Sequence, residues 1–186
     1  GSLQQKLHHD IGFDFKVVKV LCMDLKIVQF EKGEHLNNKI NFESQIPFLQ
    51  KGLLKEYANV DGSERIKRFY LSDQFISNVS DKYLNEFSEF HIEALLQSRV
   101  VMMTLKNLKP DAFENVKNAI TLHLLREELH ALEFQYGIGL MSTPKQRLLY
   151  FNERMPELIN IISRKNIAYF LNMRPETLSR LRRGKS

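Results

Sequence analysis

The chain has 186 residues, of which 43% are hydrophobic and 26% are charged, and this balance is typical of folded globular proteins. No apolar run approaches the roughly 18 residues that a transmembrane helix needs, so we expect no membrane partner. Cys22 is the only cysteine, which excludes an internal disulfide and an iron–sulfur cluster held by four thiolates. Length and cysteine content therefore predict a cytoplasmic protein with one large and one small domain.

The net charge of +5 is concentrated near one end of the chain. From Arg164 to Lys185 there are seven basic residues and one acidic residue, a charge of +6. The remainder holds 20 basic and 21 acidic residues, a charge of −1. A near-neutral body with a basic end is typical of proteins that bind the phosphate backbone of nucleic acids. A basic terminus that is merely solvated is the alternative.

Short runs rich in Val, Ile, Phe and Tyr dominate residues 15–105 and predict a succession of strands. The clearest runs cover residues 15–20, 27–30, 48–57 and 65–70. Asp61-Gly62 is typical of a type I′ hairpin, because both residue types tolerate a positive φ. Gly33 and Gly52 indicate further turns. Many short strands separated by turns predict a sandwich, a jelly roll or a barrel.

From Pro110 onward the apolar period changes from two to between three and four, which predicts a long helix from about Asp111 to Gln135. Gly137 would supply its left-handed cap. One apolar stripe consists of Phe113, Val116, Ile120 and Leu124. The other, which we call the seam, has heptad spacing and consists of Leu122, Leu125, Leu129, Leu132 and Tyr136. We expect the first stripe to pack on its own domain and the seam to form a homodimer; burial in a monomer core is the alternative.

A third region begins at Thr143-Pro144, where threonine is a typical N-cap and proline a typical first helical residue. Leu148, Leu149 and Phe151 are expected to point inward along the helix that follows, and Pro156 to limit it.

Residues 164–183, RKNIAYFLNMRPETLSRLRR, carry the pattern of a helix-turn-helix. Ala168 is the small residue required where two helices cross, and Asn172, four positions later, tolerates a positive φ in the turn. Ser163 is placed to cap the first helix and Pro175 to begin the second. The apolar positions are filled by Ile167, Leu171, Met173, Leu178 and Leu181. The pattern predicts that the chain binds double-stranded DNA.

The second helix, residues 175–183, would read the DNA. Arg180 can donate two hydrogen bonds to guanine and Glu176 can accept one from cytosine, so these residues, four apart, would contact neighbouring base pairs. An ion pair between them on a solvated helix is the alternative. Arg183 also points outward on this helix. The residues better suited to phosphates are Arg164, Lys165, Thr177 and Ser179.

The ending ISRKNIAYFLNMRPETLSRLRR resembles the C-terminus of Crp/Fnr-type bacterial regulators, particularly short members from Bacteroidetes. FEKGEHL at 30–36, LQKGLLKEYANVDGSE at 49–64, SDQFIS at 72–77 and FHIEAL at 90–95 follow the order of that family's cyclic-nucleotide-binding-like β-roll. The resemblance implies an α+β protein. Its parts would be a jelly-roll-like β-roll sensor (a double-stranded β-helix) at 3–109, a long dimerisation helix at 110–138 and a helix-turn-helix domain at 139–186.

The resemblance also implies the function. It implies a transcription regulator that binds an inverted-repeat promoter site as a homodimer, with Glu176 and Arg180 at the base-contacting positions. RNA polymerase is a further candidate partner, and the β-roll would hold a small-molecule effector of unknown identity.

The expected effector is not cyclic AMP. Family members that bind it hold its phosphate with a Gly-Glu pair, which would fall near Ser77-Asn78, and with an Arg-Ser or Arg-Thr pair, which would fall near Ser88-Glu89. No arginine occupies this cassette, and Glu89 would repel the phosphate. Ser72 also replaces the glycine of the family's Gly-Asp-Phe element.

Other chemistry-bearing residues form no recognisable centre. His8-His9 with Asp10 are expected to be solvated rather than to bind a metal, and His123 and His130 are candidates to face their dimer mates. The sequence lacks a Gly-rich phosphate loop, a nucleophile elbow and an HExxH motif, so we expect neither an enzyme nor a haem protein. A ligand-binding or protein-interaction β-roll, whose basic tail serves assembly, is the alternative function. Salt-sensitive, sequence-selective DNA binding would distinguish the two.

Overall fold

The computed structural model describes residues 2–41, 45–77 and 90–184. The chain forms two compact units. The first consists of Gly1–Glu56 and Phe69–Leu129, and the second of Tyr57–Arg68 and His130–Ser186. Among the described helices, none combines the length and the apolarity needed to cross a membrane.

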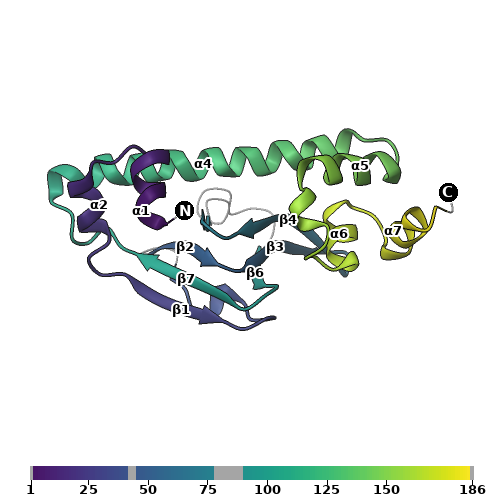
Figure 1. Ribbon diagram of the computed structural model, residues 1–186, viewed down its shortest axis with the longest axis horizontal. Helices are drawn as coiled ribbons and strands as arrows, with labels where there is room; N and C mark the ends of the chain where they lie inside the picture. The colour runs from purple at the N-terminus through teal and green to yellow at the C-terminus, as the bar shows by residue number, and fades with distance from the viewer. Residues whose placement is uncertain (1, 42–44, 78–89, 185–186) are drawn as a thin grey trace. The chain divides into compact units, whose positions relative to one another are not determined.

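Within the described residues seven strands form two sheets, so the predicted β-roll is confirmed (Figure 1). The first sheet has the order β1-β7-β2-β5, and its strands cover Lys26–Phe30, Ser98–Met103, Ile46–Lys51 and Gln74–Phe75, respectively. The second has the order β4-β3-β6, and its strands cover Ser63–Leu71, Leu53–Val60 and His91–Ala94. A 3-10 turn, η2, covers Leu36–Asn38. In the first sheet β7 pairs antiparallel with both β1 and β2.

The chain crosses between the sheets at two neighbouring points. Gly52, with φ 130°, joins β2 to β3, and a Cβ there would lie 2.8 Å from the Cα of Ser98. The second crossing joins β4 to β5 through Ser72 and Asp73. The crossings are bonded together, because the Gly52 N–H donates to Ser72 Oγ at 3.1 Å and the Asp73 N–H to the Leu49 carbonyl at 2.7 Å. The turn predicted at Gly52 is therefore a sheet corner that only glycine fits.

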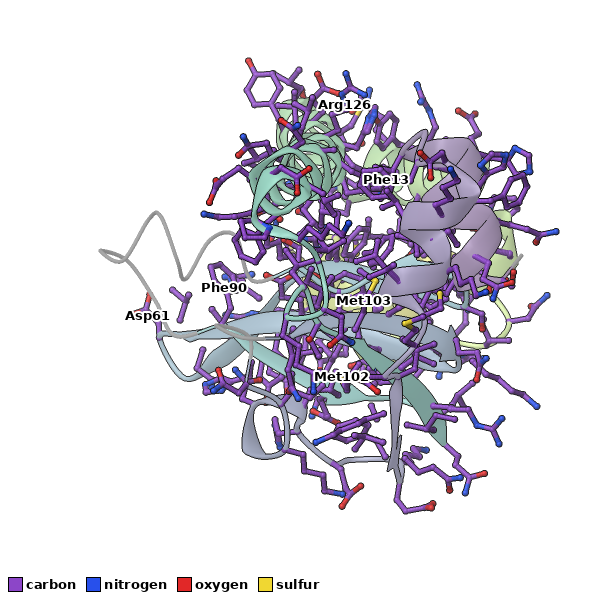
Figure 2. All side chains as sticks on the ribbon, turned by 90° about the vertical axis from the view of Figure 1, so that its left-hand side faces the viewer. Phe13, Asp61, Phe90, Met102, Met103 and Arg126 are labelled. Carbon is purple, nitrogen blue, oxygen red and sulfur yellow. The ribbon has the colours of Figure 1, made fainter. Side chains whose placement is uncertain are left out.

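Strand β7 divides the apolar side chains of the first unit into two cores. Met102 lies in the interior of the roll, and the adjacent Met103 packs on the opposite face (Figure 2). This alternation follows from the period of two in a strand. The second core also contains Leu7 and Val18 from the N-terminal helices and Ile120 from the long helix. The roll is therefore filled on the inside and covered by helices on one outer face.

Residues 15–20 form a helix, so the strand predicted there is wrong. Helix α2 covers Phe15–Leu21, and it follows α1 (Leu3–Gln5) and the π-helical turn η1 (Lys6–Asp10). Asp14 caps α2 by accepting from the Val17 N–H at 2.9 Å. Val18 and Leu21, three residues apart, are buried. The cap and this packing override the strand propensity of the β-branched residues.

The long helix, α4, covers Pro110–Leu140 and therefore continues past the end predicted at Gln135 and past the predicted cap at Gly137. Gly137 is not in the left-handed region. A Cβ there would lie 2.6 Å from the hydroxyl oxygen of Tyr150. Gly137 thus makes room for a neighbouring tyrosine within a continuous helix and does not cap it.

The hairpin predicted at Asp61-Gly62 is confirmed, with φ values of 50° and 74° between β3 and β4. The second unit also contains α5 (Pro144–Arg154), the 3-10 turn η3 (Pro156–Leu158), α6 (Arg164–Phe170) and α7 (Pro175–Arg182). Thr143 caps α5 as predicted, in a capping box with Gln146. Phe151 is buried and Leu148 partly so, but Leu149 is exposed, so its predicted inward position is wrong.

Candidate nucleic-acid interface

Helices α6 and α7 form the predicted helix-turn-helix. Ser163 caps α6 by accepting from the Asn166 N–H at 3.2 Å, and Ala168 is fully buried where the helices cross. Asn172 has φ 51°, in the left-handed region required by the turn. The Met173 N–H then donates to the Ala168 carbonyl at 3.0 Å. The local pattern is thus confirmed at its cap, its crossing point and its turn.

Pro175 is the first residue of α7, as predicted, and Arg174 is the N-cap. Leu178 is fully buried and Leu181 partly buried, which fixes the inward face of the helix. The opposite face is therefore free to meet solvent or a ligand.

The residues predicted to contact DNA lie on the surface of the second unit. Glu176, Arg180 and Arg183 are exposed on and just after α7, while Thr177 and Ser179 are half-buried. Arg164 and Lys165 are exposed at the start of α6. Within the described part of the chain, Glu176 and Arg180 form no ion pair, so the alternative of a solvated i,i+4 pair does not hold in this structure.

Two residues that hold the helix-turn-helix were missed by the sequence analysis. Arg147 on α5 and Gln135 on α4 donate to main-chain carbonyls at the end of α6 and in the turn. Carbonyl acceptors are offered by every residue type, so the sequence pattern gave no sign of these contacts.

The seam on α4 is solvent-exposed in the single chain. The exposed fractions are 51% for Leu122, 44% for Leu125, 56% for Leu129, 47% for Leu132 and 70% for Tyr136. By contrast, Val116 and Ile120 of the other stripe are buried in the first unit, as predicted. An apolar stripe of this length, left in water, is unusual for a monomer.

The histidines occupy separate environments. His8 donates from Nδ1 to the Phe13 carbonyl at 2.7 Å and stacks on Phe15. His123 is half-buried and meets the Phe75 ring edge-on at 5.6 Å, so it does not belong to the exposed seam, whereas His130 is exposed. Burial lowers the pKa of His123. No group of three His, Cys, Asp or Glu residues within the described ranges is placed to hold a metal ion.

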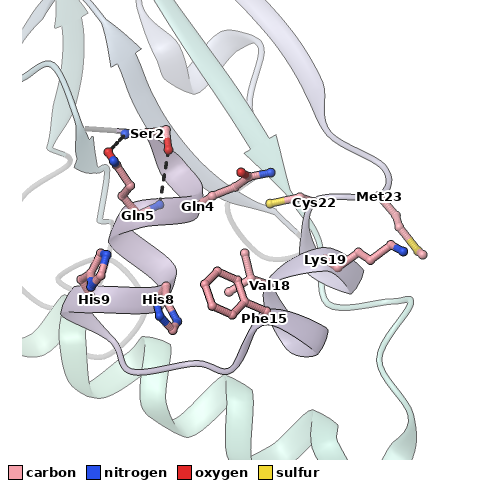
Figure 3. Close-up of a pocket in the computed structure, with 10 residues that line it drawn as sticks. All are labelled: Ser2, Gln4, Gln5, His8, His9, Phe15, Val18, Lys19, Cys22 and Met23. Carbon is pink, nitrogen blue, oxygen red and sulfur yellow. Dashed lines mark hydrogen bonds between the residues drawn. The ribbon is translucent and has the colours of Figure 1, made fainter.

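The N-terminal helices border a surface cavity of about 740 Å³ (Figure 3). Phe15, Val18 and Met23 give it an apolar part, and Lys19 and Gln4 give it a polar part. Burial raises the pKa of the Cys22 thiol at its edge, which disfavours the reactive thiolate.

A cluster of buried polar side chains lies beside Ser77, at the start of the cassette. Tyr70 donates its hydroxyl proton to Glu56 at 2.8 Å, and the Ser77 N–H donates to the Tyr70 hydroxyl at 3.4 Å. Glu56 and Ser77 are both buried. Asn78, Ser88 and Glu89, the other predicted cassette residues, lie outside the described residues.

The fold has clear counterparts among solved structures. A protein described as a transcriptional regulator of the Crp/Fnr family from Eubacterium rectale aligns with a TM-score of 0.69 at 16% identity, over 98% of this chain and 87% of its own. FixK2 from Bradyrhizobium japonicum aligns with a TM-score of 0.67 at 19% identity, over 87% and 84%. CLP, a regulator from Xanthomonas campestris that responds to c-di-GMP, aligns with a TM-score of 0.65 at 13% identity, over 92% and 91%. No protein-family model and no curated protein sequence matches the chain.

Proposed function

We propose that this chain, which has the fold of the Crp/Fnr-type regulators, is a transcription regulator that binds DNA as a homodimer. The observation that carries the proposal is the complete helix-turn-helix, whose second helix exposes Glu176 and Arg180 without an ion pair between them. Arg180 would donate to guanine and Glu176 would accept from cytosine in the major groove. Arg164 and Lys165 would contact phosphates and fix the position of the protein on the duplex.

The homodimer is supported by the seam. Its heptad spacing is that of two helices packed side by side, and its five apolar side chains are 44–70% exposed in the single chain. A second copy of α4 offers the same spacing and would cover these side chains through a two-fold interface. The proposed dimer therefore explains why the helix is apolar on two faces.

The dimer predicts the form of the DNA site. Two α7 helices related by a two-fold axis would enter successive major grooves, about 34 Å or roughly 10 base pairs apart. The site would then be an inverted repeat.

The effector proposed for the β-roll is a small molecule other than cyclic AMP. This proposal rests on the cassette, which lacks the arginine that would neutralise a cyclic-nucleotide phosphate. Calorimetry with millimolar cyclic AMP should give no heat of binding, and micromolar affinity would contradict this part of the proposal. RNA polymerase is proposed as a further partner, which would contact the regulator when it is bound to DNA.

In vitro selection from a random duplex library tests the proposed function. The wild-type chain should enrich an inverted repeat, and binding to the selected duplex should weaken with salt and exceed binding to a scrambled duplex by about a thousandfold or more. The double variant Glu176→Ala, Arg180→Ala should enrich a different sequence or none. Equal affinity for both duplexes at every salt concentration would favour the assembly role of the basic helices.

A further inference from the structure

One side chain that lies outside the helix-turn-helix donates hydrogen bonds to three main-chain carbonyls, two of which belong to the motif. Arg147, on α5, donates from Nη1 to the Leu171 carbonyl at 3.2 Å and to the Asn172 carbonyl at 3.0 Å. Its Nε donates to the Met141 carbonyl at 3.2 Å. One guanidinium thus joins the segment before α5, the end of α6 and the turn before α7.

These carbonyls need an external donor for a physical reason. The last carbonyls of a helix have no partner within it, and Leu171 is the C-cap of α6. Asn172 follows with φ 51°, a conformation that costs free energy for any residue other than glycine. A charged, planar donor satisfies both carbonyls at once, and a positive charge is favourable at the C-terminal end of a helix.

A second side chain holds the preceding carbonyl. The amide nitrogen of Gln135, on α4, lies 3.5 Å from the Phe170 carbonyl and donates more closely to Ile66 and Lys67 of β4, at 3.2 and 3.1 Å. The same region is packed by Phe134, whose ring contacts those of Tyr150 and Phe170 at 5.1 and 5.6 Å between centroids. The carbonyls of residues 170–172 are therefore held from α4 and α5 and not only by the helix-turn-helix itself.

We propose that Arg147 is a positioning residue for DNA reading, which fixes the turn between α6 and α7 and so the direction in which α7 presents Glu176 and Arg180. The proposal rests on the proposed DNA-binding function. Arg147 acts on the turn and does not touch DNA. Ile167, Ala168 and Leu178 are buried in the two helices, but apolar contacts are less directional than the two hydrogen bonds from Arg147 to the Leu171 and Asn172 carbonyls. Specific reading requires side chains held to within about 0.5 Å.

Three variants test the role of Arg147. Arg147→Met removes the donors and keeps most of the aliphatic chain, whereas Arg147→Lys keeps the charge but loses the planar fork. Lys145→Met is the control, because Lys145 is an exposed cation on the same helix with no partner in the described part of the chain. Each variant is made in the full chain, and circular dichroism checks that it is folded.

Hydrogen exchange of the free protein is the first measurement. The amides of residues 171–174, 176 and 177 should exchange about tenfold faster in Arg147→Met, less so in Arg147→Lys, and at the wild-type rate in Lys145→Met. The second measurement is affinity for the duplex selected by the wild type and for its scrambled version. Arg147→Met should lose about tenfold on the selected duplex and less than about twofold on the scrambled one, since positioning serves base contacts.

Unchanged exchange in Arg147→Met would overturn the proposal whatever the DNA result, and so would equal losses on both duplexes, which would make Arg147 a phosphate contact. If Arg147→Met does not fold, Arg147→Lys decides by the same two measurements. If the wild type does not distinguish the duplexes while exchange at the turn still rises, Arg147 fixes the turn as proposed and the DNA-reading function fails.

Discussion

The molecule exposes two surfaces of opposite chemistry, the apolar seam on α4 and the polar face of α7. The seam consists of leucines and a tyrosine, and water is a poor solvent for them. The face of α7 consists of Glu176, Arg180 and Arg183, which are well solvated when free. Exposure alone therefore does not identify a partner; the chemistry of the exposed atoms does. A seam of this kind should bind its own copy almost independently of salt, whereas α7 should bind DNA with strong salt dependence.

The largest expected effect comes from charging the seam. The double variant Leu125→Lys, Leu129→Lys should give monomers. Lysine is compatible with a helix, but its charged side chain is not compatible with an apolar contact between two helices. Loss of the second half-site contact should weaken binding to the selected duplex by about 10²–10⁴-fold. Sedimentation at micromolar concentration measures the first effect and binding isotherms the second. Asn118→Lys, at an exposed position of the same helix, is the control. A wild-type chain that already sediments as a monomer would contradict the proposal that the seam forms a dimer.

Next in size is the effect of removing Arg180. Arg180→Ala should cost about 1–3 kcal/mol on the selected duplex and relax one base position in each half-site. Isotherms on the selected and scrambled duplexes measure the cost, and a repeated selection identifies the relaxed position. Equal weakening on both duplexes would make Arg180 a phosphate contact, and the reading face of α7 would have to be rotated.

A smaller and uniform effect is expected at α6. Arg164→Ala should weaken all sequences about equally and reduce the slope of log affinity against log salt by about 0.9 per half-site. Binding of both duplexes at four salt concentrations tests this expectation. A loss confined to the selected duplex would instead assign Arg164 to base reading.

The smallest effect is expected on the buried side of α4. Burial lowers the pKa of His123 in the folded chain, so as the pH falls this imidazole is protonated first in the unfolded chain. The neutral, buried His123 therefore contributes to the free energy of unfolding above pH 6.5. This contribution is lost as the pH falls through the lower pKa of the folded chain. The wild-type Tm should therefore drop on acidification more than that of His123→Gln, while the dimer is unchanged.

The charged groups facing His123 are Asp10 and Glu127, which oppose the lowering of its pKa, and Lys6 and Arg126, which assist it. Thermal melts between pH 7.5 and 5.5 compare the two chains, and parallel Tm curves would exclude His123 as the titrating group.

The helix-turn-helix could be predicted because its requirements are local. A cap at Ser163, a small residue at Ala168 and a positive-φ residue at Asn172 lie within ten positions, so their spacing is visible in the sequence. Several strands of the β-roll were predicted from short runs rich in Val, Ile, Phe and Tyr, although residues 48–57, predicted as one run, belong to two strands, β2 and β3.

The errors occurred where distant residues decide the local structure. Residues 15–20 have the composition of a strand, but their helix packs against the roll and α4. Gly137 resembles a cap in sequence, but its role depends on Tyr150, which belongs to the next helix. Arg147 has no signature at all, because its partners are carbonyls 24 and 25 positions away.

The boundary between the two compact units has a consequence for engineering. It cuts the chain three times, between residues 56 and 57, 68 and 69, and 129 and 130, and each cut falls inside a strand or a helix rather than in a linker. The helix-turn-helix is therefore not part of a unit that begins at residue 139 and could be moved to another protein by a single cut there. A transplant of residues 139–186 alone would lack residues 57–68, from β3 and β4, and residues 130–138 of α4, which belong to the same compact unit. A chimera should instead exchange residues 57–68 together with 130–186.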